Sequence, residues 1–135
     1  MSEVNKSKTV LIVEDSPTQT MQLEQLLVNN GLTVLCARDG EQGLHQAQLH
    51  LPNLIVLDIE LPGMDGLQLC KLLKENRHTH SIPIILFTHF TDIETTKYGF
   101  QAGAIKYIPK DEHADKALLE ALRSAGLIGE IEKAK

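Results

Sequence analysis

Short runs of apolar residues alternate along this chain with longer segments in which apolar residues recur every three or four positions. The runs are apolar at nearly every position, which is typical of parallel strands buried on both faces. The longer segments have the spacing of amphipathic helices. The runs predict strands at Thr9–Val13, Thr33–Ala37, Leu54–Leu57, Ile82–Phe87 and Ala104–Ile108. Five strands alternating with helices predict a doubly wound α/β fold, in which helices cover both faces of a parallel sheet.

Local signals mark the starts of several predicted helices. Ser16 is a candidate N-cap, with Pro17 at the first helical position and Gln19 at the third, where its amide can complete a capping box. The segments that begin at Asp39 and Thr91 repeat this capping pattern. These capping signals therefore predict the first residues of the helices more precisely than helix propensity alone.

The last helix has the clearest apolar face. Its apolar residues at helical spacing are Ala114, Ala117, Leu118, Ala121, Leu122 and Ala125. We expect Gly126 to end this helix and Gly31 to end the first, because glycine readily adopts the left-handed conformation found at helix ends.

Composition narrows the class of protein. The chain has 135 residues, of which 42% are apolar and 23% charged, so one globular domain is expected rather than a disordered segment. The net charge of −5 argues against direct binding to nucleic acid or to anionic lipid. No apolar stretch approaches the roughly 20 residues that span a bilayer. Residues 1–8 lack the apolar core of a secretory signal, so we expect a cytoplasmic protein.

Two cysteines are present. Cys36 lies in a predicted strand and Cys70 on the apolar side of a predicted helix. We expect both to be buried free thiols rather than a disulfide or a redox pair.

Four predicted strands end at, or just before, residues suited to phosphoryl-transfer chemistry. These residues are the adjacent pair Glu14 and Asp15, then Asp58, Thr88 and Lys110. The carboxyl ends of parallel strands share one edge of a sheet, and ligands bind in the crevice beyond it. The pattern therefore predicts three carboxylates, a hydroxyl and an ammonium group in one pocket.

Such a set has a definite chemistry. Carboxylates about 4 Å apart repel by roughly 4 kcal/mol at an intermediate dielectric, and a divalent cation relieves that repulsion. Mg²⁺ suits the site because it takes a few carboxylates and keeps several waters. Asp58 can attack a phosphoryl group, while Thr88 and Lys110 can bind its oxygens. Taken singly, each residue also has an ordinary interpretation as a cap, turn or loop residue, so the argument depends on their joint occurrence.

The motifs around these residues resemble the receiver domain of two-component response regulators. The similar stretches are Leu11–Ser16, Leu57–Gly66, Ile82–Thr88 and Gly103–Lys110, and the family's order is kept over roughly residues 8–125. The resemblance implies a flavodoxin-like sheet in the order 2-1-3-4-5 with five helices. It also implies a single receiver domain over residues 1–135, with short tails outside the core.

The resemblance assigns the metal and phosphoryl sites. Asp58 is the expected phosphoacceptor. Mg²⁺ is expected to bind Glu14, Asp15, Asp58 and the backbone carbonyl of Glu60.

It also assigns the switch. Thr88 and Lys110 are expected to contact the phosphoryl group, and Tyr107 is the expected aromatic switch residue. In the family, the hydroxyl and the aromatic ring move together. That movement changes the face formed by the fourth helix, the fifth strand and the fifth helix.

Three positions depart from the family pattern. Asp111 follows Lys110 where proline is usual, and we expect a trans peptide bond there because a cis bond before a non-proline residue costs about 3–4 kcal/mol. His89 replaces a small residue, and we expect it to narrow access to the phosphoryl group. Glu60, two residues after Asp58, occupies a position that modulates phosphate lifetime in the family.

The expected function is that of a stand-alone response regulator receiver. A histidine kinase or phosphotransfer protein would donate a phosphoryl group to Asp58 in a Mg²⁺-dependent step. The protein would be a signalling switch rather than an enzyme, with self-catalysed phosphorylation and slow autodephosphorylation. Its output would be contact with an unidentified protein target. A homodimer through the face formed by the fourth helix, the fifth strand and the fifth helix is a further possibility.

Three other classes of protein stay open as alternatives. An aspartate-nucleophile phosphatase would also use Asp58, and it typically has a second acid at the position of Glu60, but the chain has no room for a cap domain. A flavodoxin-like cofactor binder is disfavoured because Glu14 and Asp15 would repel a flavin phosphate. A receiver-like scaffold that works without phosphorylation is disfavoured by the complete set of residues.

Overall fold

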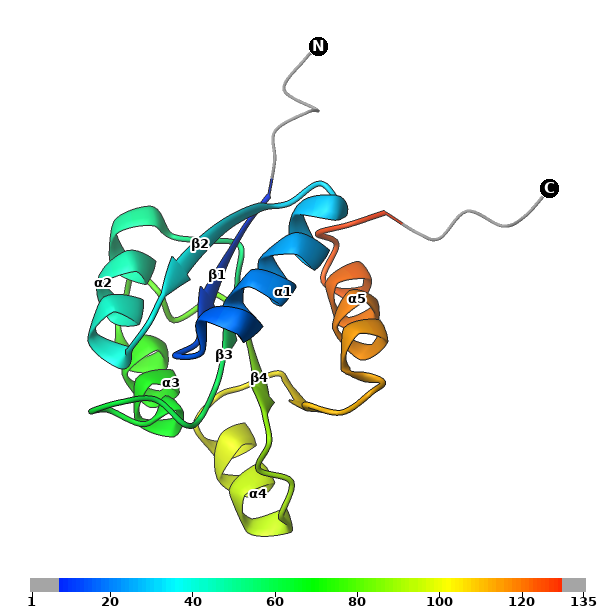
Figure 1. Ribbon diagram of the computed structural model, residues 1–135. Helices are drawn as coiled ribbons and strands as arrows, with labels where there is room; N and C mark the ends of the chain where they lie inside the picture. The colour runs from blue at the N-terminus through cyan, green and yellow to red at the C-terminus, as the bar shows by residue number, and fades with distance from the viewer. Residues whose placement is uncertain (1–7, 130–135) are drawn as a thin grey trace, which may run out of the picture.

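A five-stranded parallel sheet forms the centre of the computed structural model, which describes residues 8–129. The strands are β1 (Thr9–Val13), β2 (Thr33–Ala37), β3 (Leu54–Leu57), β4 (Ile84–Thr88) and β5 (Lys106–Pro109). The helices are α1 (Pro17–Asn29), α2 (Gly40–His50), α3 (Gly66–Glu75), α4 (Ile93–Gln101) and α5 (Ala114–Ser124). The strand order is β2-β1-β3-β4-β5, which confirms the doubly wound fold and the expected order (Figure 1).

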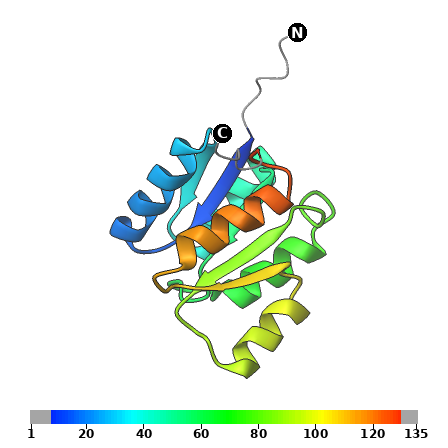
Figure 2. The same ribbon diagram turned by 90° about the vertical axis from the view of Figure 1, so that its right-hand side faces the viewer.

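The sheet separates two apolar cores. Successive side chains of a strand point to opposite faces, so Leu11 and Val13 enter one core while Val10 and Ile12 enter the other. Helices α2 and α3 cover the first face, and α1 and α5 cover the second (Figures 1 and 2). Because both faces are covered, β1, β3 and β4 are buried almost throughout, as their continuous apolar runs predict.

The first three strands have the predicted bounds, but the last two begin two residues later and end one residue later than predicted. The run from Ile82 begins outside the ladder, because the Ile82 N–H donates to the Thr79 carbonyl at 3.0 Å and Pro83 has no N–H to donate. The β4 strand therefore begins at Ile84. The first residue of the run from Ala104 belongs to the end of α4 rather than to a strand, since the Ala104 N–H donates to the Gly99 carbonyl at 3.1 Å. Regular pairing of β5 therefore begins at Lys106.

Two of the three predicted N-caps are confirmed. Ser16 and Asp39 each accept a hydrogen bond from the backbone N–H three residues further on. The third prediction, Thr91, is wrong, because Asp92 caps α4 and accepts from the Thr95 N–H at 2.9 Å. A carboxylate also complements the positive end of the helix dipole, which a threonine hydroxyl cannot do.

The two predicted glycine stops are confirmed by their backbone angles. Gly31 has a φ of +86° and Gly126 a φ of +80°, both in the left-handed region. Ala125, by contrast, does not lie on the apolar face of α5. It is the C-cap and is exposed, so the buried stripe ends at Leu122.

The cysteines are free, as expected, but only one of them is buried. Burial raises the pKa of the Cys70 thiol to about 11. Cys36 is half-buried, because β2 is an outer strand that lacks a neighbour on one side. Within residues 8–129, no helix has the length and apolar character needed to cross a bilayer.

Gly66, the first residue of α3, lies directly against the backbone that follows β3. Its N–H donates to the Ile59 carbonyl at 2.7 Å. A Cβ at this position would lie 2.1 Å from the carbonyl oxygen of Asp58. The start of α3 therefore limits how the segment after β3 can run.

Replacing Gly66 with alanine is expected to lower the free energy of unfolding by about 3 kcal/mol, because backbone rather than a flexible side chain must move. Urea unfolding of native and Gly66→Ala protein measures the difference. Gly129→Ala is the control, since a Cβ there meets nothing within 4 Å. The control should stay within about 0.5 kcal/mol of the native protein. Equal midpoints for native and Gly66→Ala protein would contradict this packing argument.

Candidate functional site

Hydrogen bonds just beyond the strands bring the predicted residues to one edge of the sheet. The Asp58 N–H donates to the Val13 carbonyl at 3.0 Å, and the Lys110 N–H donates to the Thr88 carbonyl at 2.9 Å. Each bond continues a parallel ladder one residue past the end of a strand. Asp58 and Lys110 are therefore held by the sheet rather than by free loops.

The Lys110 ammonium group is the centre of the site. Its Nζ lies 2.7 Å from Glu14 Oε1 and 2.7 Å from Asp58 Oδ2, and it also donates to Gln19 Oε1. The Lys110, Glu14 and Asp58 side chains are only 5–7% exposed. An ammonium group has three hydrogens, so all of its donors are engaged. One positive charge thus lies between two buried negative charges.

Backbone N–H groups hold the remaining oxygens of the two buried carboxylates. Glu14 Oε2 accepts from the Ser16 N–H at 3.1 Å, and Asp58 Oδ1 accepts from the Glu60 N–H at 3.2 Å. Hydrogen bonds from backbone N–H groups to a carboxylate fix its orientation. The site is therefore oriented from both sides, by Lys110 and by the chain after β1 and β3.

A pocket of about 390 Å³ opens above these groups. Glu14, Asp15 and Asp58 all line it, and Asp15 is exposed. Within residues 8–129, no three His, Cys, Asp or Glu side chains already converge as a metal site. The three carboxylates nonetheless offer oxygen donors only, and such donors fit Mg²⁺, which needs few protein ligands.

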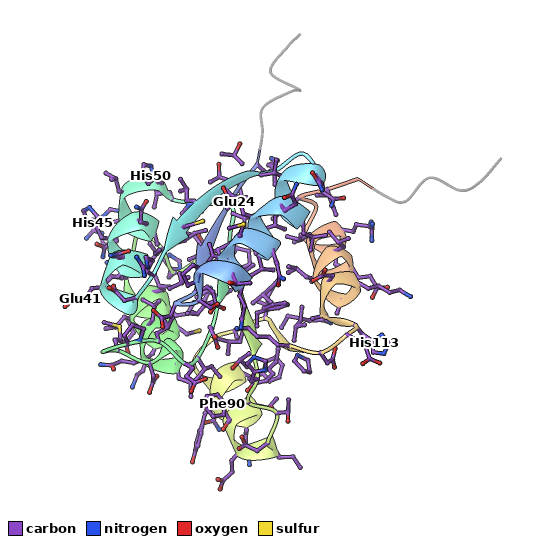
Figure 3. All side chains as sticks on the ribbon, viewed as in Figure 1. Glu24, Glu41, His45, His50, Phe90 and His113 are labelled. Atoms are coloured by element: carbon purple, nitrogen blue, oxygen red, sulfur yellow. The ribbon has the colours of Figure 1, made fainter. Side chains whose placement is uncertain are left out.

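The two expected switch residues lie behind the pocket and share one partner, Phe90. Thr88 is fully buried, and its hydroxyl accepts from the Phe90 N–H at 3.3 Å. Tyr107 is half-buried and donates to the Phe90 carbonyl at 2.5 Å. Burial raises the pKa of the Tyr107 phenol. Neither residue lines the pocket, and both bind Phe90, which Figure 3 labels beside α4.

The departures from the family pattern lie around the pocket mouth. Glu60 and His89 are exposed and both line the pocket. The peptide bond between Lys110 and Asp111 is trans, as expected. The histidines that Figure 3 labels, on α2 and before α5, point away from the body of the protein.

Sequence reasoning missed two members of this network. Gln19 was expected to accept from the Ser16 N–H and close a capping box, but Glu14 takes that N–H. The Gln19 amide is thereby free to reach Lys110. Phe90 takes part only through its backbone, which leaves no signal in the sequence.

The matched family is the response regulator receiver domain, and the match spans residues 10–123. The chain belongs to the response regulator receiver family. The family acts as a signalling switch rather than as a classic enzyme, and phosphorylation and Mg²⁺ binding are general features of it. This confirms the resemblance found in the sequence motifs.

Individual relatives agree with this assignment. Protein PilH of Pseudomonas aeruginosa is 37% identical over 102 residues, which cover 75% of this chain and 84% of PilH. The transcriptional regulatory protein TctD of Salmonella typhimurium is 35% identical over 92% of this chain. This chain spans only 23–56% of the longer transcriptional regulators that it matches.

Solved structures show the same fold. A response regulator from Chloroflexus aurantiacus superposes with a TM-score of 0.82 at 34% identity, covering 90% of this chain and 99% of that one. The chemotaxis protein CheY4 of Vibrio cholerae also gives a TM-score of 0.82, at 27% identity, covering 89% and 99%.

Replacing Lys110 with methionine is expected to lower the free energy of unfolding by roughly 3–5 kcal/mol, because two buried carboxylates lose their counter-charge. Urea unfolding at neutral pH measures the loss. The control is Lys116→Met, which removes an exposed lysine of α5 and should change stability by no more than about 0.5 kcal/mol. A Lys110→Met variant as stable as the control would show that the bridge contributes little.

Proposed function

We propose that Asp58 accepts a phosphoryl group, in a Mg²⁺-dependent step, from a histidine kinase or a phosphotransfer protein. The observation that supports this most is the placement of Asp58 Oδ2 against the Lys110 ammonium in a pocket at the sheet edge. A buried carboxylate held in this way is oriented for attack and lies beside a cation that can bind the incoming group.

The proposed step is the transfer of one phosphoryl group from the donor to Asp58. An Asp58 oxygen forms a bond to phosphorus, the bond from phosphorus to the donor's leaving group breaks, and the leaving group departs with that electron pair. Lys110 transfers a hydrogen bond from the carboxylate to a phosphoryl oxygen. Glu14, Asp15 and Asp58, with the Glu60 carbonyl, would hold Mg²⁺, which supplies neutralising charge when bound. Slow hydrolysis of the acyl phosphate would reset the switch.

The switch, in this proposal, is the segment that begins with Phe90. The Thr88 hydroxyl and the Tyr107 hydroxyl bind the N–H and the carbonyl of this one residue. A phosphoryl group that draws the Thr88 hydroxyl toward itself would break the hydrogen bond from the Phe90 N–H to that hydroxyl. The hydrogen bond between the Tyr107 hydroxyl and the Phe90 carbonyl would then weaken. A local charge would then change the conformation of the chain before α4.

Output would go through the face formed by α4, β5 and α5, to a protein target. Ile93 is 85% exposed there, and Tyr98 and Ile105 are each more than half exposed. Apolar side chains gathered on one face are typical of a protein contact. A second copy of the chain is one candidate partner, which would give the homodimer left open by the sequence.

Incubation with Mg²⁺ and acetyl phosphate is expected to add the mass of one phosphoryl group to the native protein. Intact-mass spectrometry measures the gain, and chelation of the metal should abolish it. Asp58→Asn should show no gain, because the amide lacks the nucleophilic oxygen. A gain that persists in Asp58→Asn would place the acceptor elsewhere. No gain with either acetyl phosphate or a purified kinase would favour the phosphorylation-independent scaffold.

His89→Ala is expected to speed both phosphorylation by acetyl phosphate and hydrolysis of the product, because it removes a bulky ring from the pocket mouth. Stopped-flow and radiolabel measurements give the two rates. His113→Ala is the control, since His113 is exposed and lies before α5, outside the residues that line the pocket. Unchanged rates in His89→Ala would show that His89 does not limit access.

A further inference from the structure

Gln19 is the partner of Lys110 that none of the expected roles includes. We propose that Gln19 is a positioning residue that holds the Lys110 ammonium in place while its two carboxylate partners change theirs. The inference rests on the proposed phosphoryl acceptance at Asp58.

The need for such a residue follows from the three acceptors of Lys110. Glu14 and Asp58 both belong to the set proposed to bind Mg²⁺ and the phosphoryl group. As they take new partners, their hydrogen bonds to Lys110 are shared or lost. The Gln19 amide oxygen belongs to neither set, so it alone can keep its bond throughout the reaction.

Without the hydrogen bond to Gln19, the Lys110 side chain could move into a neighbouring acidic pocket. A second pocket, of about 530 Å³, adjoins the first, and Gln19, His89 and Lys110 line both. Asp111 and Asp115 line the second pocket and carry carboxylates that attract a lysine. A lysine side chain is long and flexible. The hydrogen bond to Gln19 therefore favours the position of Lys110 beside Asp58 over a competing position beside Asp111 and Asp115.

Gln19 is well placed to resist this movement. It lies in the first turn of α1, where its own N–H donates to the N-cap Ser16 Oγ at 3.3 Å. Its side chain is free for Lys110 because Glu14 Oε2 takes the Ser16 N–H. The anchor is thus a helix end rather than a mobile loop.

The neutrality of the amide is also part of the role. A carboxylate at this position would hold Lys110 equally well, but it would place a third negative charge beside Glu14 and Asp58. That charge would repel an incoming phosphoryl group. Glutamine supplies the acceptor without the charge.

Two readouts on the full chain test the proposal. The first is the ¹⁵N-detected signal of the Lys110 ammonium, recorded with saturating Mg²⁺ so that Glu14 and Asp58 are engaged by the metal rather than by Lys110. The signal is assigned by its absence in Lys110→Arg, and it is visible only when a hydrogen bond holds the ammonium group and slows its proton exchange. The second is the phosphorylation rate with Mg²⁺ and saturating acetyl phosphate. The variants are Gln19→Leu, which removes the acceptor, and Gln19→Glu, which keeps it and adds charge.

In Gln19→Leu the ammonium signal should disappear, and phosphorylation should slow on the order of tenfold, as for the loss of one hydrogen bond to a charged group. Gln19→Glu should restore the signal but remain slower than the native protein. Gln22→Leu is the matched control, because Gln22 lies on the same helix and lines the second pocket without a bond to Lys110. It should behave as the native protein in both readouts.

The outcomes separate this inference from the proposed function. A native protein with no Lys110 ammonium signal, or a Gln19→Leu variant with the native rate, overturns the positioning role. A native protein that accepts no phosphoryl group overturns the proposed function, and the positioning role with it, while the ammonium signal still reports whether Gln19 holds Lys110. If Gln19→Leu does not fold, Gln19→Glu decides, since a native rate there contradicts the requirement for a neutral acceptor.

Discussion

The arrangement of this site depends on one ammonium group between two buried carboxylates. Glu14 and Asp58 are almost inaccessible to water, and each would be costly to bury without a counter-charge. Lys110 supplies that charge to both at 2.7 Å. A hydrophobic triad of the same size would serve stability as well, but it could not receive a charged ligand. The three charged groups are therefore not explained by stability alone.

The parallel sheet makes this ion-pair arrangement possible. Lys110 lies 96 positions from Glu14 and 52 from Asp58 in the chain. The strand order places β3 and β4 between β1 and β5, and the four carboxyl ends share one edge. The site forms only when β1 and β5 belong to the same sheet, so its integrity reports on the folding of the sheet.

The site is connected to the surface through backbone rather than through a relay of side chains. Phe90 offers its N–H to Thr88 and its carbonyl to Tyr107, on neighbouring strands. Gly99 lies against the Tyr107 ring, where a Cβ would come within 3.2 Å of it and 2.6 Å of Leu86. The ring is thus confined by α4 on one side and by the segment after β4 on the other.

The sequence by itself determined the alternation of elements, the bounds of the first three strands and the identity of the residues at the sheet edge. These features follow from local patterns, because burial on both faces requires apolar runs and parallel strands end at a common edge. Where two local signals competed, as at Thr91 and Asp92 or at Pro83, the pattern misplaced an end by one or two residues. Only the tertiary structure decided that Glu14 takes the Ser16 N–H and leaves Gln19 to Lys110, and that Phe90 joins Thr88 and Tyr107. The physical reason is that several acceptors compete for each donor. Which acceptor lies within hydrogen-bonding distance depends on how segments far apart in the chain pack together.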